Sequence, residues 1–191
     1  MLNLILFGPP GSGKGTQAEN IIEKYNILHL STGDMFRFEL SNNTELGQLA
    51  KSYMNRGELV PDSVTIAMLE QRVNANPDAK GIIFDGFPRT VAQAEALDSF
   101  LASKGTEISL LIALDVPEEE LLRRLLDRGK SSGRADDSDV NIIKNRISVY
   151  GTETSPVFDF YFAKHKAKKI DGLGTVEEIF DRISGSIDPL V

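Results

Sequence analysis

The sequence contains no cysteine and no tryptophan, and only two of its 191 residues are histidines. Without cysteine, the chain forms no disulfide, no thiolate nucleophile and no cysteine-ligated zinc site. His29 and His165 are too few to build a histidine metal cluster, and neither is expected to carry chemistry. The lack of disulfides suits a reducing compartment, so we expect the protein to act in the cytoplasm.

Positive charge is in the minority, and long apolar runs are missing. The chain has 21 Lys and Arg residues against 28 Asp and Glu residues, a net charge of −7, which predicts no nucleic-acid partner. Small phosphate ligands stay possible, because a local arginine cluster binds them whatever the overall charge. No stretch approaches the roughly 20 apolar residues of a membrane span, and the start, MLNLILFGPPG, lacks the charged beginning of a signal peptide. We therefore expect a soluble, unprocessed protein with no membrane partner.

Short apolar runs alternate with longer segments of helical period along most of the chain. This alternation predicts an α/β fold in one globular domain, with parallel strands and helices on both faces of the sheet. Helices are expected directly after the glycine-rich segment that ends at Thr16, near Asp62, after Val116 and, with a Thr175–Glu178 capping box, after Gly174. The five predicted strands are Leu2 to Phe7, Ile27 to Leu30, Gly81 to Phe84, Ile108 to Leu114 and Ala167 to Ile170.

Two stretches do not fit this alternation. Residues 31–60 contain the turn-forming dipeptides NN, RG and VP, which predict small helices joined by turns. Residues 128–139 read RGKSSGRADDSD, a polar and glycine-containing composition that is typical of a mobile surface loop. Both stretches are candidates for parts that move over a bound substrate.

A glycine-rich segment, GPPGSGKGT from Gly8 to Thr16, lies between the first predicted strand and the first predicted helix. Its spacing is that of a phosphate-binding loop, in which backbone N–H groups and a helix N-terminus surround phosphate oxygens. The residue after Lys14 is Gly15, so the position of the usual magnesium-binding hydroxyl is vacant and the hydroxyl comes one residue later. The alternative is a glycine-rich turn that carries a surface lysine.

Four more motifs follow this loop: STGDMFR (Ser31 to Arg37), GELVPD (Gly57 to Asp62), DGFPRT (Asp85 to Thr90) and SGRADD (Ser132 to Asp137). In this order and spacing, the five motifs resemble those of the adenylate kinase family, of the short-lid type, within the nucleoside monophosphate kinases. The resemblance covers almost the whole chain. It implies a three-layer P-loop NTPase fold with a five-stranded parallel sheet, a small monophosphate-binding subdomain and a short lid.

The resemblance also implies a reaction and its partners. The family transfers the terminal phosphoryl group of Mg-ATP reversibly to AMP, giving two ADP, and so serves adenine nucleotide homeostasis. The reaction uses Mg²⁺, and the short lid without cysteine excludes a zinc-bearing lid. The family resemblance also suggests a monomer. By the same resemblance, residues 1–30, 61–126 and 138–191 form the core, residues 31–60 the monophosphate-binding subdomain and residues 127–137 the lid.

Individual residues take their roles from this resemblance. The ATP-binding positions are Gly11, Ser12, Gly13, Lys14, Gly15, Thr16, Arg128 and Gly174. The AMP-binding positions are Thr32, Arg37, Glu58, Leu59, Val60, Gly86, Phe87, Pro88, Arg89, Gln93, Arg134 and Arg146. The catalytic positions are Lys14, Arg89, Arg128, Arg134 and Arg146. Such cations are suited to neutralise charge on a transferring phosphoryl group. The candidate metal residues are Asp85 and Asp34, acting through bound water.

Several of these residues have a simpler interpretation. An arginine in an acidic protein is usually a surface ion-pair partner, and Arg146 lies on a predicted amphipathic helix, where it would be solvated. Thr90 and Gln93 stand three residues apart at a helix start, so they can form a capping box, with or without a base-binding role for Gln93. Asp85 and Gly86 can form a turn at the end of a strand.

Three other functions compete with adenylate kinase activity. A UMP or CMP kinase shares the fold and most of the arginines, although Gln93 and Thr32 favour adenine. A nucleotide-dependent switch or ATPase has no need to grip a second phosphate, which is the role that DGFPR and the arginine set suggest. A sugar or shikimate kinase shares only the phosphate-binding loop.

Overall fold

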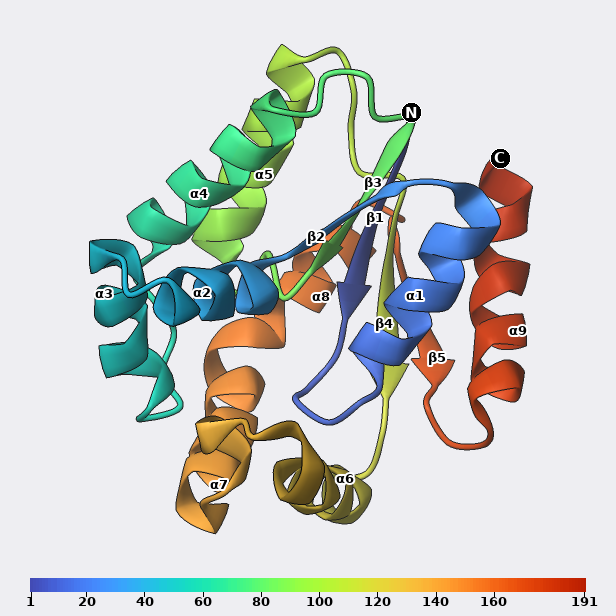
Figure 1. The fold of residues 1–191 in the computed structure, drawn as a ribbon. Coiled ribbons are helices and arrows are strands. Elements are labelled where there is room, and N and C mark those ends of the chain that lie inside the picture. Colours follow the sequence, from blue (N-terminus) through green and yellow to red (C-terminus); the bar gives the residue numbers. More distant parts are fainter.

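The computed structural model describes residues 1–191, apart from the side chain of Ala135. Its centre is a five-stranded parallel sheet with the strand order β2-β3-β1-β4-β5 (Figure 1). The strands are β1 (Leu2–Phe7), β2 (Leu28–Ser31), β3 (Gly81–Asp85), β4 (Leu110–Asp115) and β5 (Ala167–Asp171). The predicted α/β fold and all five predicted strands are confirmed, with differences of one or two residues at some strand ends.

Helices cover both faces of the sheet (Figure 1). They are α1 (Lys14–Tyr25), α4 (Asp62–Asn74), α5 (Val91–Ser103), α8 (Pro156–Phe162) and α9 (Val176–Ile187). Because successive strand residues point to opposite faces, Leu4 and Leu6 of β1 pack in the core under α1 and α9. Ile5 and Phe7 pack in the other core, under α4, α5 and α8. Burial on both faces explains why β1 is apolar at nearly every position.

Residues 31–60 form two short helices, as predicted. These are α2 (Thr32–Ser41) and α3 (Glu45–Met54), which lie beside the sheet and next to α4 (Figure 1). Phe36 and Val60 belong to a small apolar core of this region, separate from the two cores that flank the sheet. The helix pair therefore packs on itself and on Val64 and Met68 of α4.

The chain between β4 and β5 forms most of the remaining structure. A long helix, α6, is followed by a 3-10 turn, by α7 and by a π-helical turn that leads into α8. Their bounds are Glu118–Ser132, Ala135–Asp137, Val140–Val149 and Tyr150–Thr154, and a 3-10 turn at Asp188–Leu190 follows α9. Among the described residues, no helix is both long enough and apolar enough to cross a membrane.

The loop expected over residues 128–139 is wrong for its first part, because α6 continues to Ser132. Gly129 lies within α6, and its lack of a side chain lets another part of the chain pack closely against the helix. A Cβ atom at Gly129 would lie 2.3 Å from the carbonyl oxygen of Asp137. The helix ends instead at Gly133, which adopts a left-handed conformation with φ of 65°. The polar, glycine-containing composition of residues 128–132 therefore indicated a loop, although these residues are helical and Gly129 is needed for a contact with the backbone of Asp137.

The predicted capping box at the start of α9 is confirmed. The Thr175 hydroxyl accepts a hydrogen bond from the backbone N–H of Glu178 at 3.2 Å, and the Glu178 carboxylate accepts one from the backbone N–H of Thr175 at 2.8 Å. Two backbone donors at the helix start are thus satisfied reciprocally.

Candidate active site

The segments that follow β1, β2 and β3 meet at one edge of the sheet. These strands are parallel neighbours, and Ser31 at the end of β2 is in register with Asp85 at the end of β3. The glycine-rich loop follows β1, the STGDMFR motif starts at the end of β2, and the DGFPRT motif starts at the end of β3. In open parallel sheets, ligands bind at the carboxyl ends of the strands. Three motifs that are far apart in the sequence therefore face one region.

The glycine-rich loop turns tightly from β1 into α1. Gly11 and Gly13 have φ angles of 84° and 96°, which residues with a side chain rarely adopt. Gly11 also lies against α6, where a Cβ atom would come within 2.9 Å of Leu125 Cγ. In the described part of the chain, no side chain caps the first N–H groups of α1, which begins at Lys14. Such an uncapped helix N-terminus favours an anion.

Lys14 folds back over this loop. Its Nζ donates hydrogen bonds to the carbonyl oxygens of Gly8 at 2.8 Å and Pro9 at 3.0 Å. Burial disfavours the charged ammonium and lowers the pKa of Lys14 to about 8, while the Asp85 carboxylate acts in the opposite direction. The positive charge of Arg89 lowers this pKa further. The negative charge of a bound polyphosphate would stabilise the ammonium form of Lys14.

Arg124 contacts the same loop, although no sequence motif includes it. Its guanidinium donates to the Glu120 carboxylate at 2.7 Å and to the carbonyl oxygen of Gly172 at 3.1 Å, and Nη1 lies 3.5 Å from the carbonyl oxygen of Ser12. It therefore ties α6 both to the glycine-rich loop and to the segment after β5. The available signal was spacing: Arg124 stands four residues before Arg128, so the two share one helix face.

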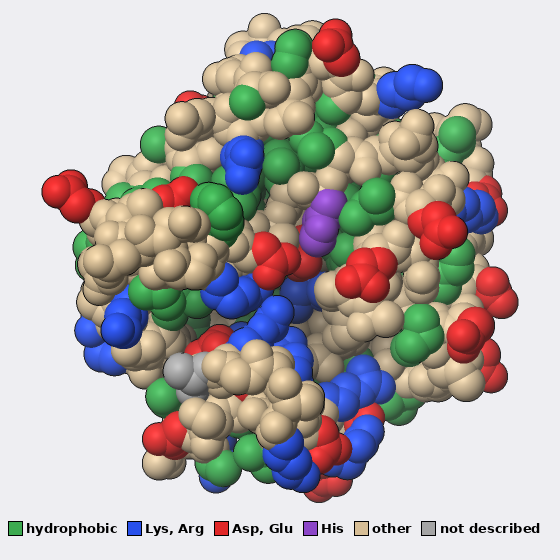
Figure 2. Space-filling view, in the orientation of Figure 1, with side chains coloured by type: hydrophobic (Ala, Val, Ile, Leu, Met, Phe, Trp, Pro, Cys, Tyr) green, Lys and Arg blue, Asp and Glu red, His purple; other side chains and the backbone are tan. Residues whose placement is uncertain are grey.

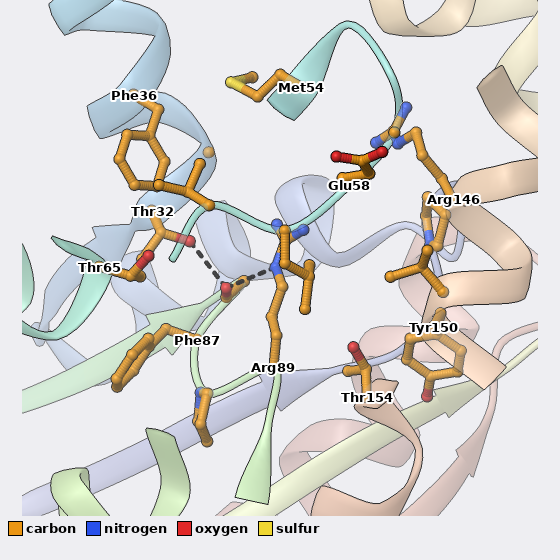
Figure 3. Close-up of a pocket in the computed structure, with 18 of the residues that line it drawn as sticks. Thr32, Phe36, Met54, Glu58, Thr65, Phe87, Arg89, Arg146, Tyr150 and Thr154 are labelled. Carbon is orange, nitrogen blue, oxygen red and sulfur yellow. Dashed lines mark hydrogen bonds between the residues drawn. The ribbon is translucent and has the colours of Figure 1, made fainter. Parts of the chain in front are cut away.

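A pocket lies between the α2–α3 pair, the DGFPRT motif and the end of α7. Figure 2 shows Lys and Arg side chains gathered in the hollow at the centre of this face. The predicted site residues that line the pocket are Lys14, Thr32, Arg37, Glu58, Leu59, Val60, Gly86, Phe87, Pro88, Arg89, Gln93 and Arg146. Residues that were not predicted also line it, among them Phe36, Met54, Tyr150 and Thr154 (Figure 3). The predicted residues outside this lining are Gly11, Ser12, Gly13, Gly15, Thr16, Asp34, Asp85, Arg128, Arg134 and Gly174.

Arg89 lies in the middle of the pocket (Figure 3). Its Nε donates to the carbonyl oxygen of Gly86 at 2.8 Å, and the Thr32 hydroxyl donates to the same oxygen, also at 2.8 Å. These bonds fix the guanidinium beneath α2. Burial, together with the positive charge of Arg146, lowers the pKa of Arg89 to about 10. The side chain stays protonated at neutral pH and is a fixed, poorly hydrated cation.

Asp137 holds two of the predicted arginines together. Its buried carboxylate accepts hydrogen bonds from Arg128 Nε at 2.6 Å and Nη2 at 3.0 Å, and from Arg146 Nη1 at 2.6 Å. Asp136 adds an ion pair with Arg146 at 2.9 Å. Burial acts to raise the pKa of Asp137, but the bonds and charges of the two arginines lower it below its usual value. With only 20% of its side chain exposed, Arg146 is not the solvated surface residue of the simpler interpretation.

Two further arginines approach the pocket from α2 and from the segment after α6. Arg37 forms an ion pair with Asp34 one turn earlier in α2. Burial lowers the pKa of Arg134, and the positive charges of Arg37 and Arg128 lower it further. Arg134 is therefore close enough to both cations for their charges to act on it. Such a concentration of guanidinium groups is stabilised by a bound polyanion.

Gln93 is buried between α4 and α5 and is fully oriented by hydrogen bonds. Its Nε2 donates to Asp62 Oδ1 at 2.7 Å, and its Oε1 accepts from the backbone N–H of Arg89 at 2.7 Å. The Thr90 hydroxyl accepts from the backbone N–H of Gln93 at 3.1 Å and donates to Asp62 Oδ2 at 3.0 Å. The capping box considered for Thr90 and Gln93 is therefore half right. Thr90 caps α5, but the Gln93 side chain reaches the N–H of Arg89.

Asp85, a candidate metal residue, lies at the end of β3 beside His29. Its Oδ2 is 3.5 Å from His29 Nε2, whereas Asp34, the second candidate, is bound by Arg37. Within residues 1–191 as described, no group of three or more His, Cys, Asp or Glu side chains is placed to hold a metal ion.

The parallel sheet, the phosphate-binding loop at a helix N-terminus and the arginines around one pocket define a nucleotide kinase of the phosphate-loop class. A profile of the family described as adenylate kinase matches residues 6–166. The chain is 55% identical over 190 residues to the adenylate kinase of Flavobacterium psychrophilum and 53% identical over 190 residues to that of Bacteroides fragilis, with 100% of each chain covered. It is 49% identical to the adenylate kinase of Porphyromonas gingivalis over 188 residues, 98% of this chain and 96% of the relative. The chain belongs to the adenylate kinase family.

This assignment confirms the activity predicted from the motifs, that of a nucleotide-binding ATP:AMP phosphotransferase. Adenylate kinases generally use Mg-ATP, in agreement with the predicted cofactor. The competing interpretations as a UMP or CMP kinase, a nucleotide-dependent switch or a sugar kinase are not the family that the comparisons find.

Proposed function

We propose that the pocket is the acceptor site, which binds AMP, and that the glycine-rich loop with the start of α1 is the donor site, which binds the phosphates of Mg-ATP. One observation carries this division: Arg37, Arg89 and Arg146 line a single pocket together with Lys14. Lys14 belongs to the glycine-rich loop, whereas the arginines come from three other elements. The pocket therefore reaches the donor loop at the point where a phosphoryl group would pass between two nucleotides.

The charged side chains divide between the two substrates. Arg37 and Arg89 are suited to grip the AMP phosphate, because a guanidinium fork matches two phosphate oxygens. The remaining cations neutralise charge on the transferring group, and phosphoryl transfer needs this together with positioning more than it needs a covalent nucleophile. These cations are Lys14, Arg128, Arg134 and Arg146. On the donor side, the ATP-binding residues are Gly11, Ser12, Gly13, Lys14, Gly15, Thr16, Arg128 and Gly174.

Magnesium bound with ATP would supply positive charge at the phosphates. Thr16 is exposed and Gly15 has no side chain, so a carboxylate has to take the place of the usual hydroxyl ligand. Asp85 is the better candidate, because the Asp34 carboxylate is already bound by Arg37. Asp85 is buried at the end of β3, and we propose that it contacts magnesium through water, which magnesium retains readily. No zinc is proposed.

Gln93 and Thr32 are proposed to select adenine. Gln93 offers both a donor and an acceptor, which suit the amino group and ring nitrogen of adenine. Residues Glu58, Leu59 and Val60 complete the AMP site on the α3 side, and residues 86–88 complete it on the β3 side. A UMP or CMP kinase would need a different base-binding edge at this place.

Residues 31–60 and 127–137 are proposed to close over the substrates, as the monophosphate-binding subdomain and the lid. Residues 1–30, 61–126 and 138–191 form the core on which both move. The apolar cluster of α2 and α3 is separate from the two cores that flank the sheet, which supports this division, and Val64 and Met68 of α4 are the residues on which it would move. Closure would expel water and so protect the phosphoryl group from hydrolysis.

The proposal is tested by measuring ADP formation from Mg-ATP with AMP, CMP, UMP, GMP or no acceptor. AMP is expected to give by far the highest kcat/KM. A rate with AMP no higher than the blank would overturn the acceptor site, and equal rates with CMP or UMP would overturn its adenine selectivity. Arg89→Ala should remove most of the activity, whereas Arg72→Ala, at an exposed arginine of α4, is the matched control.

Action as a monomer and in the cytoplasm stay predictions. Light scattering of the purified protein with and without both substrates tests the first, and a mass of two chains would contradict it. Fractionation of the source cells tests the second.

A further inference from the structure

Asp62, the first residue of α4, is the last residue of the GELVPD motif, and the site described above assigns it no role. Its carboxylate joins two helices. Oδ1 accepts from Gln93 Nε2 at 2.7 Å, and Oδ2 accepts from the Thr90 hydroxyl at 3.0 Å. Both donors belong to the start of α5, 28 and 31 residues later in the chain.

We infer that Asp62 is a positioning residue that fixes the orientation of the Gln93 amide and thereby selects the base of the acceptor nucleotide. The inference rests on the proposed acceptor site. An ionised carboxylate only accepts hydrogen bonds, so the nitrogen of the Gln93 amide has to face Asp62. The backbone N–H of Arg89 only donates, so the amide oxygen has to face Arg89. Two independent constraints therefore select the same one of the two amide orientations.

The oriented amide presents a fixed pattern to the pocket, which Gln93 lines. Nε2 carries two hydrogens and gives one to Asp62, and Oε1 has two acceptor positions and uses one for Arg89. One donor and one acceptor, in a set order, remain for a ligand. A 6-aminopurine offers an amino donor beside a ring-nitrogen acceptor, which is complementary to this order. A 6-oxopurine has the reverse order, because its ring nitrogen carries the hydrogen and its carbonyl accepts.

AMP and IMP are the sharpest pair of acceptors for a test, because they have nearly the same size and shape and differ in this order of donor and acceptor. Binding a 6-oxopurine through Gln93 would require the amide to turn over. In the turned amide, the oxygen would face the Asp62 carboxylate and the nitrogen would face the Arg89 N–H, so two buried hydrogen bonds would be lost. Asp62 thus disfavours the binding of a 6-oxopurine as well as favouring the binding of a 6-aminopurine.

The experiment compares kcat/KM for AMP and for IMP, with Mg-ATP as donor, in wild type and in Asp62→Asn. Asparagine has nearly the size of aspartate, but its amide can donate as well as accept, so it no longer dictates which end of Gln93 it faces. The AMP-to-IMP ratio is expected to fall about tenfold, the effect of one hydrogen bond to a charged group. The KM for ATP should stay near its wild-type value.

Glu118→Gln provides the matched control. Glu118 is the first residue of α6 and follows Pro117, just as Asp62 follows Pro61 at the start of α4, but it is exposed. Its substitution removes the same charge from the same position of a helix without touching Gln93. The AMP-to-IMP ratio of this variant should match that of wild type. If Asp62→Asn fails to fold, Asp62→Ser, which also removes the constraint that Asp62 places on Gln93, is measured in its place.

Gln93→Ala, measured in parallel, separates this inference from the proposed acceptor site. If wild type shows no preference for AMP, or if Gln93→Ala keeps the full preference, the proposed acceptor site is wrong. If Gln93→Ala loses the preference while the Asp62 variant keeps it, only the role of Asp62 is overturned. An Asp62 variant that loses activity equally with AMP and IMP would likewise show that Asp62 is merely structural, and would overturn the inference.

Discussion

Raising the pH from 7 to 9 is expected to weaken the binding of Mg-ATP about tenfold through Lys14 alone. Burial lowers the pKa of Lys14 to about 8 in the free protein, so the protonated fraction is about 0.9 at pH 7 and about 0.09 at pH 9. Bound phosphate favours the ammonium form and raises this pKa again. The contribution of Lys14 to affinity is therefore fully present well below pH 8, and it falls as the pH rises from 8 towards the raised pKa of the complex.

The assay is an equilibrium titration of Mg-ATP by calorimetry, without acceptor, at pH 7, 8 and 9 and constant ionic strength. Lys14→Gln should bind ATP more weakly and show little dependence on pH over this range. Lys80→Gln, at an exposed lysine just before β3 and at the opposite edge of the sheet, should keep the wild-type dependence. An affinity that is constant from pH 7 to 9 in wild type, or the same slope in Lys14→Gln, would refute the reasoning.

Three other expectations concern single side chains. Arg89→Ala should lower kcat by about 10² to 10³ with little change in melting temperature, because it removes a fixed cation from the pocket; steady-state kinetics within tenfold of wild type would remove Arg89 from the site. Asp137→Asn should lower the free energy of unfolding in urea by about 3 kcal/mol, since it breaks a buried charge network. The pKa of Asp137 is lowered in the folded protein, so this stabilisation is present above about pH 4 and is lost as the pH falls through the folded-state pKa. Between pH 5 and pH 3, Asp137→Asn should therefore lose less free energy of unfolding than wild type. Equal losses in the two proteins would contradict this. Thr175→Ala should lower the free energy of unfolding by about 1 kcal/mol and Thr175→Ser by less, which denaturant titration checks; an unchanged Thr175→Ala midpoint would show that the capping box adds nothing.

Local sequence patterns were enough to predict the sheet and the glycine-rich loop before α1. The apolar run of β1, the glycine spacing before Lys14 and the Thr175–Glu178 box each act over a few residues, and each appears in the structure as expected. The family resemblance then named twelve of the residues that line the pocket, whereas ten of the site residues that it named lie outside the lining. Where the physics is local or the motif is contiguous, the sequence carries the information directly.

Contacts between distant segments account for what the patterns did not predict. The sequence around Gly129 predicts a loop, whereas in the structure Gly129 is helical and the backbone of Asp137 packs against it. Arg124 lies outside the motifs, and Asp62 lies within GELVPD but received no predicted role. The groups that they contact, the Ser12 carbonyl and the Gln93 amide, lie far away in the sequence. Such partners are set by the packing of helices on the sheet and become visible only with the fold.

The carboxylate of Asp137 gives the end of the molecule that carries α6 and α7 its own counter-ion. Arg128 and Arg146 belong to different helices, yet both are bound by the same buried group from the turn between them. Because the proposed lid ends at residue 137 and Arg146 lies in the proposed core, this carboxylate joins an arginine of the lid to an arginine of the core. Transfer of the proposed lid, residues 127–137, between related kinases should therefore succeed only when Arg128, Asp137 and Arg146 are transferred together.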